Sequence, residues 1–199
     1  YPKVAIFETP IPQHDVAGNR SLTAAAMRPI AMHFNNPPFL TAVRERVCDG
    51  FVVSGGAAQC LHEGRQAAEA NMPLWLQLVG TGITTAFAAH LGAVLPAARW
   101  PAITCLNTYA NDLLEVPLTI ERGFLRVPDG PGLGITVDED LLGQLRRPDA
   151  SSIEMPRAIY SIRWADGRTA EYVDHDVSDE SGRLGLLHQH FLAGNQPVF

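Results

Sequence analysis

One stretch of the chain, residues 50–79, decides the fold: GFVVSGGAAQCLHEGRQAAEANMPLWLQLV. It begins with a short apolar run that a glycine pair ends, which predicts a buried strand over Gly50–Ser54. An alanine-rich segment follows and stops before Pro73, so we expect a helix over Ala57–Asn71. A second apolar run predicts a strand over Leu74–Val79. The stretch is one strand–helix–strand unit, and such units give parallel sheets.

The same rhythm extends toward both ends of the stretch. Further strands are expected over Val4–Glu8, Pro29–Phe34 and Ala102–Leu106, and further helices over Val16–Met27, Pro37–Val47 and Ile83–Leu95. Successive strands begin about 22 to 26 residues apart, which suits strand–helix units with short loops. Apolar parallel strands of this kind occur in barrels and in open doubly wound sheets, and both remain possible here.

Polar residues recur where the predicted strands end. In barrels and in doubly wound sheets alike, ligands bind at the carboxyl ends of parallel strands. The sequence therefore predicts a site at that edge, with candidate members Glu8, His33, Asn35, Ser54, Gly55, Gln77 and Thr81.

Several of these candidates have a structural alternative. Glu8 could simply pair with a basic neighbour, and His33 could be a hydrogen-bonded pocket residue. Asn35 could bind a substrate hydroxyl or serve as an ordinary turn residue. Ser54, Gly55 and Thr81 lie between a strand and a helix, where backbone amides can hold a carboxylate but glycine also allows tight turns.

After Leu106 the strand–helix rhythm ends. Alternating residues and turn signals between Pro117 and Val137 predict a β-hairpin and an extended segment. The stretch IYSIRWADGRTAEYV predicts a second hairpin that turns at Asp166-Gly167. We therefore divide the chain into a partial barrel domain over residues 1–146, closing segment included, and a C-terminal extension with a hairpin over 147–199.

Composition narrows the class of protein. The chain is 46% hydrophobic and 18% charged, which suits a globular domain. Its formal net charge is −6 and no basic run stands out, so a nucleic-acid partner is not expected. No apolar run is long enough to span a membrane, and no signal peptide is recognised at the start. With three widely spaced cysteines and no zinc pattern, we expect free thiols and a cytoplasmic location.

Four motifs give the chain a family resemblance. They are FETPIP (Phe7–Pro12), PIAMHFN (Pro29–Asn35), SGGAAQCLHEGRQAAEANMPLWL (Ser54–Leu76) and EVPLTIERGFLRVPDGPGLGITVDED (Glu115–Asp140). Together they resemble the C-terminal barrel portion of the mandelate racemase and muconate-lactonizing branch of the enolase superfamily. The last motif, with PDGPGLG at Pro128–Gly134, is the strongest match. The resemblance implies an α/β fold, the C-terminal part of a (β/α) TIM-type barrel with parallel strands, followed by β-hairpin tail segments.

The resemblance also implies a chemistry. Members of this family abstract a proton next to a carboxylate, as racemases, cycloisomerases or acid-sugar dehydratases. A divalent cation, usually Mg²⁺, binds the substrate carboxylate and stabilises the ene-diolate, while a Lys or His base moves the proton. Glu8 matches the family's second metal ligand and His33 occupies the position of the third, so the resemblance implies Glu8 and His33 as the metal-binding residues.

Other positions depart from the family pattern. Phe34 stands where an acidic neighbour is common, and imidazole suits Zn²⁺, Mn²⁺ or Fe²⁺ better than Mg²⁺. Gln77 occupies the position of the catalytic histidine, although an amide cannot titrate and can only orient a ligand. The strand with the Lys-x-Lys base and the strand with the first metal ligand would both precede residue 1.

Two hypotheses from different classes follow. In the first, the protein is an isomerase or lyase in which His33 and Gln77 are the catalytic positions and Asn35, Ser54, Gly55 and Thr81 contact the substrate. In the second, it is a silent or divergent member that binds a carboxylate without turnover. In either case the expected partner is a small carboxylate such as an acid sugar. Because half a barrel has open strand edges, we also expect a homo-oligomer or association with the missing N-terminal portion.

Overall fold

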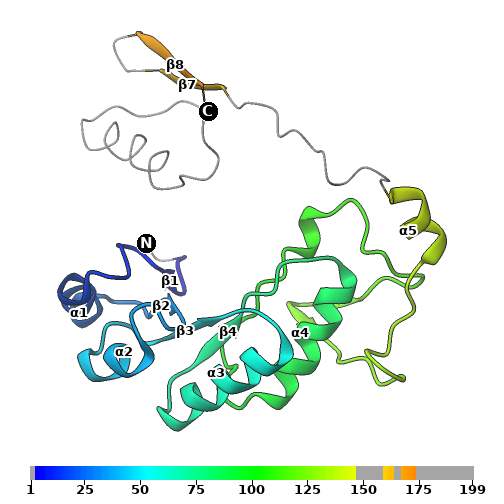
Figure 1. Ribbon diagram of the computed structural model, residues 1–199, viewed down its shortest axis with the longest axis horizontal. Helices are drawn as coiled ribbons and strands as arrows, with labels where there is room; N and C mark the ends of the chain where they lie inside the picture. Colours follow the sequence, from blue (N-terminus) through cyan, green and yellow to red (C-terminus); the bar gives the residue numbers. More distant parts are fainter. Residues whose placement is uncertain (1–2, 147–158, 164–166, 174–199) are drawn as a thin grey trace. The chain divides into compact units, whose positions relative to one another are not determined.

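The computed structural model describes residues 3–146, 159–163 and 167–173 of the chain. It divides into two compact units, Tyr1–Arg146 and Arg147–Phe199. The first unit contains the strand–helix repeats and the closing segment, and the described part of the second is a β-hairpin (Figure 1).

The first unit is built on a four-stranded parallel sheet (Figure 1). Its strands are β1 (Phe7–Glu8), β2 (Ile30–His33), β3 (Gly50–Val53) and β4 (Leu74–Leu76). They lie side by side in sequence order, β1-β2-β3-β4, and all neighbouring pairs are parallel. The predicted parallel sheet is thus confirmed, with strands shorter than the apolar runs suggested.

The strand predicted over Ala102–Leu106 is wrong as a full strand. Ile103 forms only an isolated parallel bridge with Gln77, supported by hydrogen bonds of Ile103 with Leu76 and Leu78. The backbone turns at once, because Cys105 adopts a left-handed conformation with φ of 54° and a short 3₁₀ helix follows at Leu106–Thr108. The segment takes the place next to β4 without extending the ladder.

Four helices connect and cover the strands: α1 (Val16–Ala25), α2 (Phe39–Glu45), α3 (Ala57–Glu69) and α4 (Gly82–Val94). The side chain of Asp15 caps α1 by accepting a hydrogen bond from the Gly18 amide at 2.8 Å. Helix α2 begins after the cis peptide bond between Asn36 and Pro37. Each helix follows its strand directly, as the repeating pattern predicts.

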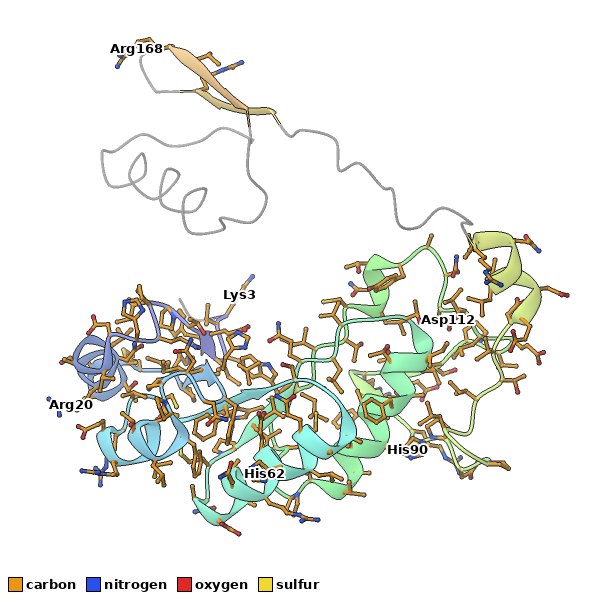
Figure 2. All side chains as sticks on the ribbon, viewed as in Figure 1. Lys3, Arg20, His62, His90, Asp112 and Arg168 are labelled. Carbon is orange, nitrogen blue, oxygen red and sulfur yellow. The ribbon has the colours of Figure 1, made fainter. Side chains whose placement is uncertain are left out.

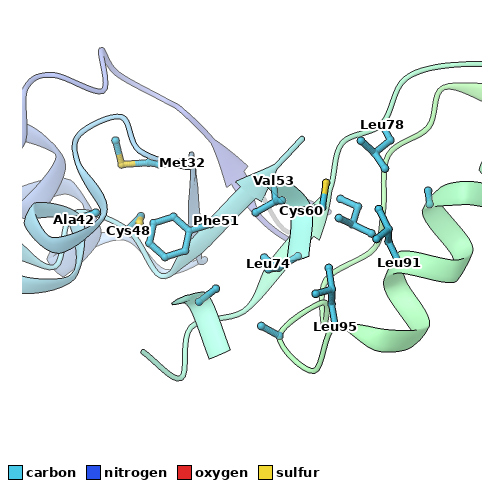
Figure 3. Packing of buried hydrophobic residues seen from close by; sticks show 14 of the residues in the cluster. Met32, Ala42, Cys48, Phe51, Val53, Cys60, Leu74, Leu78, Leu91 and Leu95 are labelled. Atoms are coloured by element: carbon cyan, nitrogen blue, oxygen red, sulfur yellow. The ribbon is translucent and has the colours of Figure 1, made fainter. Parts of the chain in front are cut away.

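The helices pack on one face of the sheet only. The main core combines alternate strand residues such as Met32, Phe51 and Leu76 with apolar residues from all four helices (Figure 3). The opposite face has a small cluster of Ala31, Val52 and Trp75 that no helix residue joins. Sequential strand order with helices on one face is the arrangement of a barrel segment, since a doubly wound sheet has helices on both faces.

The closing segment returns to α4. It contains a short antiparallel hairpin, β5 (Ile120–Glu121) with β6 (Phe124–Leu125), and ends in α5 (Glu139–Leu145). The ring of His90 on α4 lies 3.1 Å from the carbonyl oxygen of Leu133, inside the PDGPGLG motif. The amide of Gly82, at the start of α4, donates to the carbonyl of Asp112 (Figure 2 labels His90 and Asp112). The PDGPGLG motif therefore anchors the closing segment on α4.

The described part of the second unit is an antiparallel hairpin of β7 (Ile159–Arg163) and β8 (Thr169–Val173). Arg163 pairs with Thr169 at its closed end, and Gly167 adopts a left-handed conformation with φ of 88°. The hairpin is as predicted, whereas Asp166 of the predicted turn lies outside the described residues. In the part of the chain that the structure describes, no helix is long and apolar enough to cross a membrane.

All three cysteines are free thiols, as predicted. Cys48 and Cys60 are buried and Cys105 is partly exposed. Burial raises the pKa of the Cys48 thiol to about 12. Cys48 is therefore protonated at neutral pH, which makes it a core residue rather than a nucleophile.

Replacing Phe51 by alanine should unfold the core most directly. Phe51 is 1% exposed, and its ring centroid lies 4.9 Å from that of Phe34 and 5.6 Å from that of Phe39. Loss of its packing should lower the free energy of unfolding by about 3–5 kcal/mol, measured by chemical denaturation. Leu40→Ala is the control, because Leu40 is 70% exposed on α2 and should change stability little. Equal effects of the two substitutions would contradict this core.

Candidate functional site

The carboxyl ends of the four strands meet at one edge of the sheet. Glu8 and His33 are the last residues of β1 and β2, while Ser54 and Gln77 directly follow β3 and β4. Because the strands are parallel and lie in sequence order, these four polar residues succeed one another along the edge. The edge is the one that the sequence singled out.

Glu8 and His33 form the one direct contact between the predicted site residues in the described part of the chain. Nε2 of His33 lies 3.1 Å from Oε1 of Glu8. The two side chains are 45% and 32% exposed, so the pair faces solvent and is open to a ligand. The contact places the negative charge of the carboxylate beside one ring nitrogen and leaves Nδ1 as the other. This pair can orient a base or stabilise an imidazolium.

Gln13 holds the backbone of His33 through a hydrogen bond. It lies on the loop between β1 and α1 and is 7% exposed. Its Oε1 accepts a hydrogen bond of 2.7 Å from the His33 amide and one of 3.0 Å from the Thr9 hydroxyl. Gln13 thus ties the β1–α1 loop to the end of β2. No sequence pattern marks Gln13 as a site residue, because a glutamine between a proline and a helix cap is common in loops.

Two buried polar atoms lie on β4 or directly after it. Neither Nε1 of Trp75 nor Oε1 of Gln77 has a hydrogen-bond partner among the described residues. Trp75 packs in the cluster with Ala31 and Val52, and its ring is tilted by 46° against that of Trp100, with centroids 5.7 Å apart. Gln77 follows two residues later at the strand end. An unpaired buried amide oxygen is costly, so Gln77 is the residue here best prepared to receive a hydrogen-bond donor.

The remaining predicted site residues take separate positions. Asn35 adopts a left-handed conformation, and its Oδ1 accepts a hydrogen bond of 3.4 Å from the Phe39 amide. Asn35 therefore acts as a turn residue before α2. Ser54 and Gly55 are exposed between β3 and α3. Thr81 precedes α4 without capping it through its side chain. Their contact with a substrate stays a prediction.

Phe34 stands where the resemblance implies an acidic residue, and the structure shows why an aromatic ring fits there. Its ring stacks on Phe39 with centroids 5.2 Å apart and an interplanar angle of 14°. It also contacts Phe51 of the helix-facing core. Phe34 therefore packs against α2 and contributes no donor to the site.

The donors present do not form the magnesium site that the resemblance implies. Mg²⁺ prefers oxygen ligands in octahedral geometry, and imidazole is a poor ligand for it. Glu8 supplies one carboxylate, and the nearest predicted ligand to it is the His33 ring. Within residues 3–146, 159–163 and 167–173, no group of three His, Cys, Asp or Glu side chains could hold a metal ion. The assignment of Glu8 and His33 as metal ligands stays a prediction.

A cavity lies at the opposite edge of the sheet, where the strands begin. It has a volume of 540 Å³ and is lined by residues of α1 and α2 and by those that precede β3 and β4. Arg20, Arg44 and Arg46 contribute positive charge, but Arg20 already pairs with Glu45 at 3.1 Å. In barrels the amino-terminal edge serves stability and the carboxyl edge serves catalysis, so we place the candidate site at Glu8 and His33.

Known proteins share this sequence pattern over most of the first unit. Residues 2–141 match the family model for enolase C-terminal domain-like proteins. The chain belongs to this family. Muconate cycloisomerase 1-2 of Acinetobacter lwoffii is 32% identical over 154 residues, which are 72% of this chain and 40% of that protein. D-galactarolactone cycloisomerase of Agrobacterium fabrum is 42% identical over 43 residues, 22% of this chain and 11% of that protein.

Solved structures give the same fold. The muconate lactonizing enzyme from Pseudomonas fluorescens, complexed with muconolactone, has a TM-score of 0.63 at 26% identity and aligns with 72% of this chain and 41% of its own. The 2-chloromuconate cycloisomerase from Rhodococcus opacus 1CP has the same TM-score at 20% identity, over 72% of this chain and 42% of its own. The sequence given thus spans about two-fifths of these relatives, and the partial barrel fold is confirmed.

Removing the acceptor of Gln13 should loosen the site. Gln13→Met keeps the side-chain volume but leaves the partly buried His33 amide without its partner, which should lower the free energy of unfolding by about 1–3 kcal/mol. Gln66→Met on α3 is the matched control, since the Gln66 side chain makes no such bond. Urea denaturation compares the two variants. Equal midpoints for Gln13→Met and Gln66→Met would show that Gln13 does not support His33.

Proposed function

We propose that this chain contributes the carboxyl edge of an isomerase or lyase that moves a proton next to a carboxylate on a small molecule. The observation that carries the proposal is the contact between His33 and Glu8 at the end of two neighbouring barrel strands. The family and the two cycloisomerase relatives support it. The reaction is of the racemase, cycloisomerase or acid-sugar dehydratase type.

In this proposal His33 is the proton carrier and Glu8 positions it. The Glu8 carboxylate lies 3.1 Å from Nε2 and would accept a hydrogen bond from it, which favours the tautomer in which Nδ1 has the free lone pair. When Nδ1 takes a proton from the substrate carbon, the ring becomes positively charged, and the adjacent carboxylate stabilises that charge. Gln13 keeps the backbone of His33 in place during the transfer. No step is assigned to a metal ion.

Polar groups further along the edge would bind the substrate. The unpaired Oε1 of Gln77 can accept a hydrogen bond from a substrate hydroxyl. The exposed Ser54 and Gly55 can donate to a carboxylate through a hydroxyl and backbone amides, and Thr81 and Asn35 lie on adjacent loops. Such groups suit an acid sugar or an unsaturated dicarboxylate, both of which combine a carboxylate with further polar atoms.

We also infer that the sheet is completed by further chain. Within the described residues, β1 pairs with β2 alone and leaves its other edge free. An open edge of a parallel sheet is a place where another strand adds. A second copy of this chain or the remaining part of a barrel would supply that strand and enclose the polar edge.

Proton exchange tests the proposal. The protein is incubated in deuterated water with muconate, muconolactone and a panel of acid sugars, and loss of the carbon-bound proton is followed by NMR. We expect exchange with at least one compound, and His33→Gln should reduce its rate by about 10²- to 10⁴-fold, the usual contribution of a general base.

His14→Gln is the control, because His14 is exposed on the neighbouring loop and makes no side-chain contact of this kind. It should exchange at the wild-type rate. If His33→Gln exchanges as fast as wild type, His33 is not the base. If the wild-type protein exchanges no compound above the buffer rate, the proposed reaction is wrong.

A further inference from the structure

A separate cavity of 280 Å³ lies between α4, the segment before and around Ile103, and the β5–β6 hairpin. Leu76 of β4 also lines it, and Leu76 belongs to the helix-facing core. Glu8 and His33 alternate to the other face of the sheet, with Ala31 and Val52. The cavity lies beside β4, where Trp100 lines it, and neither Glu8 nor His33 is among the residues that line it.

Helix α4 lines the cavity with four small residues. Thr85, Ala88, Ala89 and Gly92 follow the spacing i, i+3, i+4 and i+7, which places them on one face of the helix. The aromatic ring of Trp100 and the side chains of Ile120 and Leu125 supply the rest of an apolar wall. None of the described residues that line the cavity carries a charge.

The hydroxyl of Thr85 is a second, independent observation. Thr85 is 3% exposed, and its Oγ1 has no hydrogen-bond partner among the described residues. A hydroxyl in a helix usually donates to the carbonyl one turn earlier, as Ser21 does to Ala17 at 3.0 Å. Thr104 also lines the cavity, but it is the buried hydroxyl of Thr85 that is left unsatisfied, which is unfavourable unless a ligand or water pairs with it.

Gly92 lies at the solvent-exposed mouth of the cavity. A Cβ atom added there would meet no other atom within 4 Å. On α3, by contrast, a Cβ atom at Gly64 would come within 2.6 Å of Leu95, so close packing explains that glycine. No such packing explains Gly92, and a glycine inside a helix is unfavourable relative to alanine. Gly92 is exposed and lines the cavity, so the open space there is where the cavity meets solvent.

We propose that this cavity binds a small uncharged molecule with a ring-sized apolar body and one hydroxyl or carbonyl group, in the chemical class of monocyclic phenols. The volume exceeds the roughly 150 Å³ that holds benzene and falls below the range typical of drug-sized ligands. The absence of lining charge among the described residues disfavours carboxylates, which the other face of the sheet is proposed to bind. The site stands independently of the proposed function.

Three probes of the same shape test the chemistry. They are 4-methylphenol, toluene, which lacks the hydroxyl, and 4-methylbenzoate, which is charged. Binding to the full chain is measured by NMR titration of the backbone amides. We expect 4-methylphenol to shift the signals of α4 and of the hairpin most strongly, toluene to bind more weakly, and 4-methylbenzoate to leave these signals unchanged.

Two variants test the place. Thr85→Val removes the hydroxyl at equal volume and should weaken 4-methylphenol about three- to tenfold while leaving toluene unchanged. Gly92→Leu fills the space and should abolish binding of both probes, although the helix itself gains stability. Ala93→Leu is the control, since Ala93 is exposed on the same helix and does not line the cavity.

The results with these variants support or overturn the proposed binding site. Wild-type affinity in Gly92→Leu, or equal losses for both probes in Thr85→Val, would overturn the proposal. Light scattering supplies a further arm: if Gly92→Leu converts an oligomer to a monomer, the cavity is an interface between chains and the small-molecule assignment is wrong. Loss of binding in a variant with unchanged mass and an unfolding midpoint at or above that of wild type supports it.

Discussion

The parallel register of β1 with β2 is the constraint on which the site depends. Pairing of Glu8 with Ala31 and of His33 with Val52 brings the ends of neighbouring strands to one edge. The 3.1 Å contact of His33 with Glu8 follows from that register. Because side chains alternate along a strand, the neighbours of these residues pack beneath the helices and bury the core. A slip of one residue would bury the imidazole and expose Met32.

The repeating units were predictable because apolar runs, glycine pairs and prolines mark them locally. The edge with the polar residues followed from those units, whereas the barrel arrangement followed only from the family resemblance, since the units alone left a barrel and an open sheet possible. The strand expected at Ala102–Leu106 failed because a left-handed residue, Cys105, ends it early, and no pattern of hydrophobicity encodes that backbone conformation. The strands are also shorter than predicted, because an apolar run includes residues that pack in the core beyond the hydrogen-bonded ladder.

The site was predictable in part. Glu8 and His33 were found because carboxylate and imidazole at strand ends suggest chemistry, and the structure brings them together. Gln13 was missed, because its role is a contact across twenty positions of chain with the His33 backbone. The unpaired Oε1 of Gln77 and hydroxyl of Thr85 were equally invisible, since only packing decides which polar atoms lose their partners. The same sheet thus has a polar edge on one side and a neutral cavity on the other.

The most direct test is to locate carboxylate binding on the chain. Muconate is titrated into ¹⁵N-labelled protein and the backbone amide shifts are mapped. We expect the largest changes at His33, Ser54 and Gln77, at the carboxyl edge of the sheet. Changes confined to Arg44 and Arg46, in the cavity at the opposite edge, would contradict it, because the charge that attracts carboxylates would then lie away from the Glu8–His33 pair.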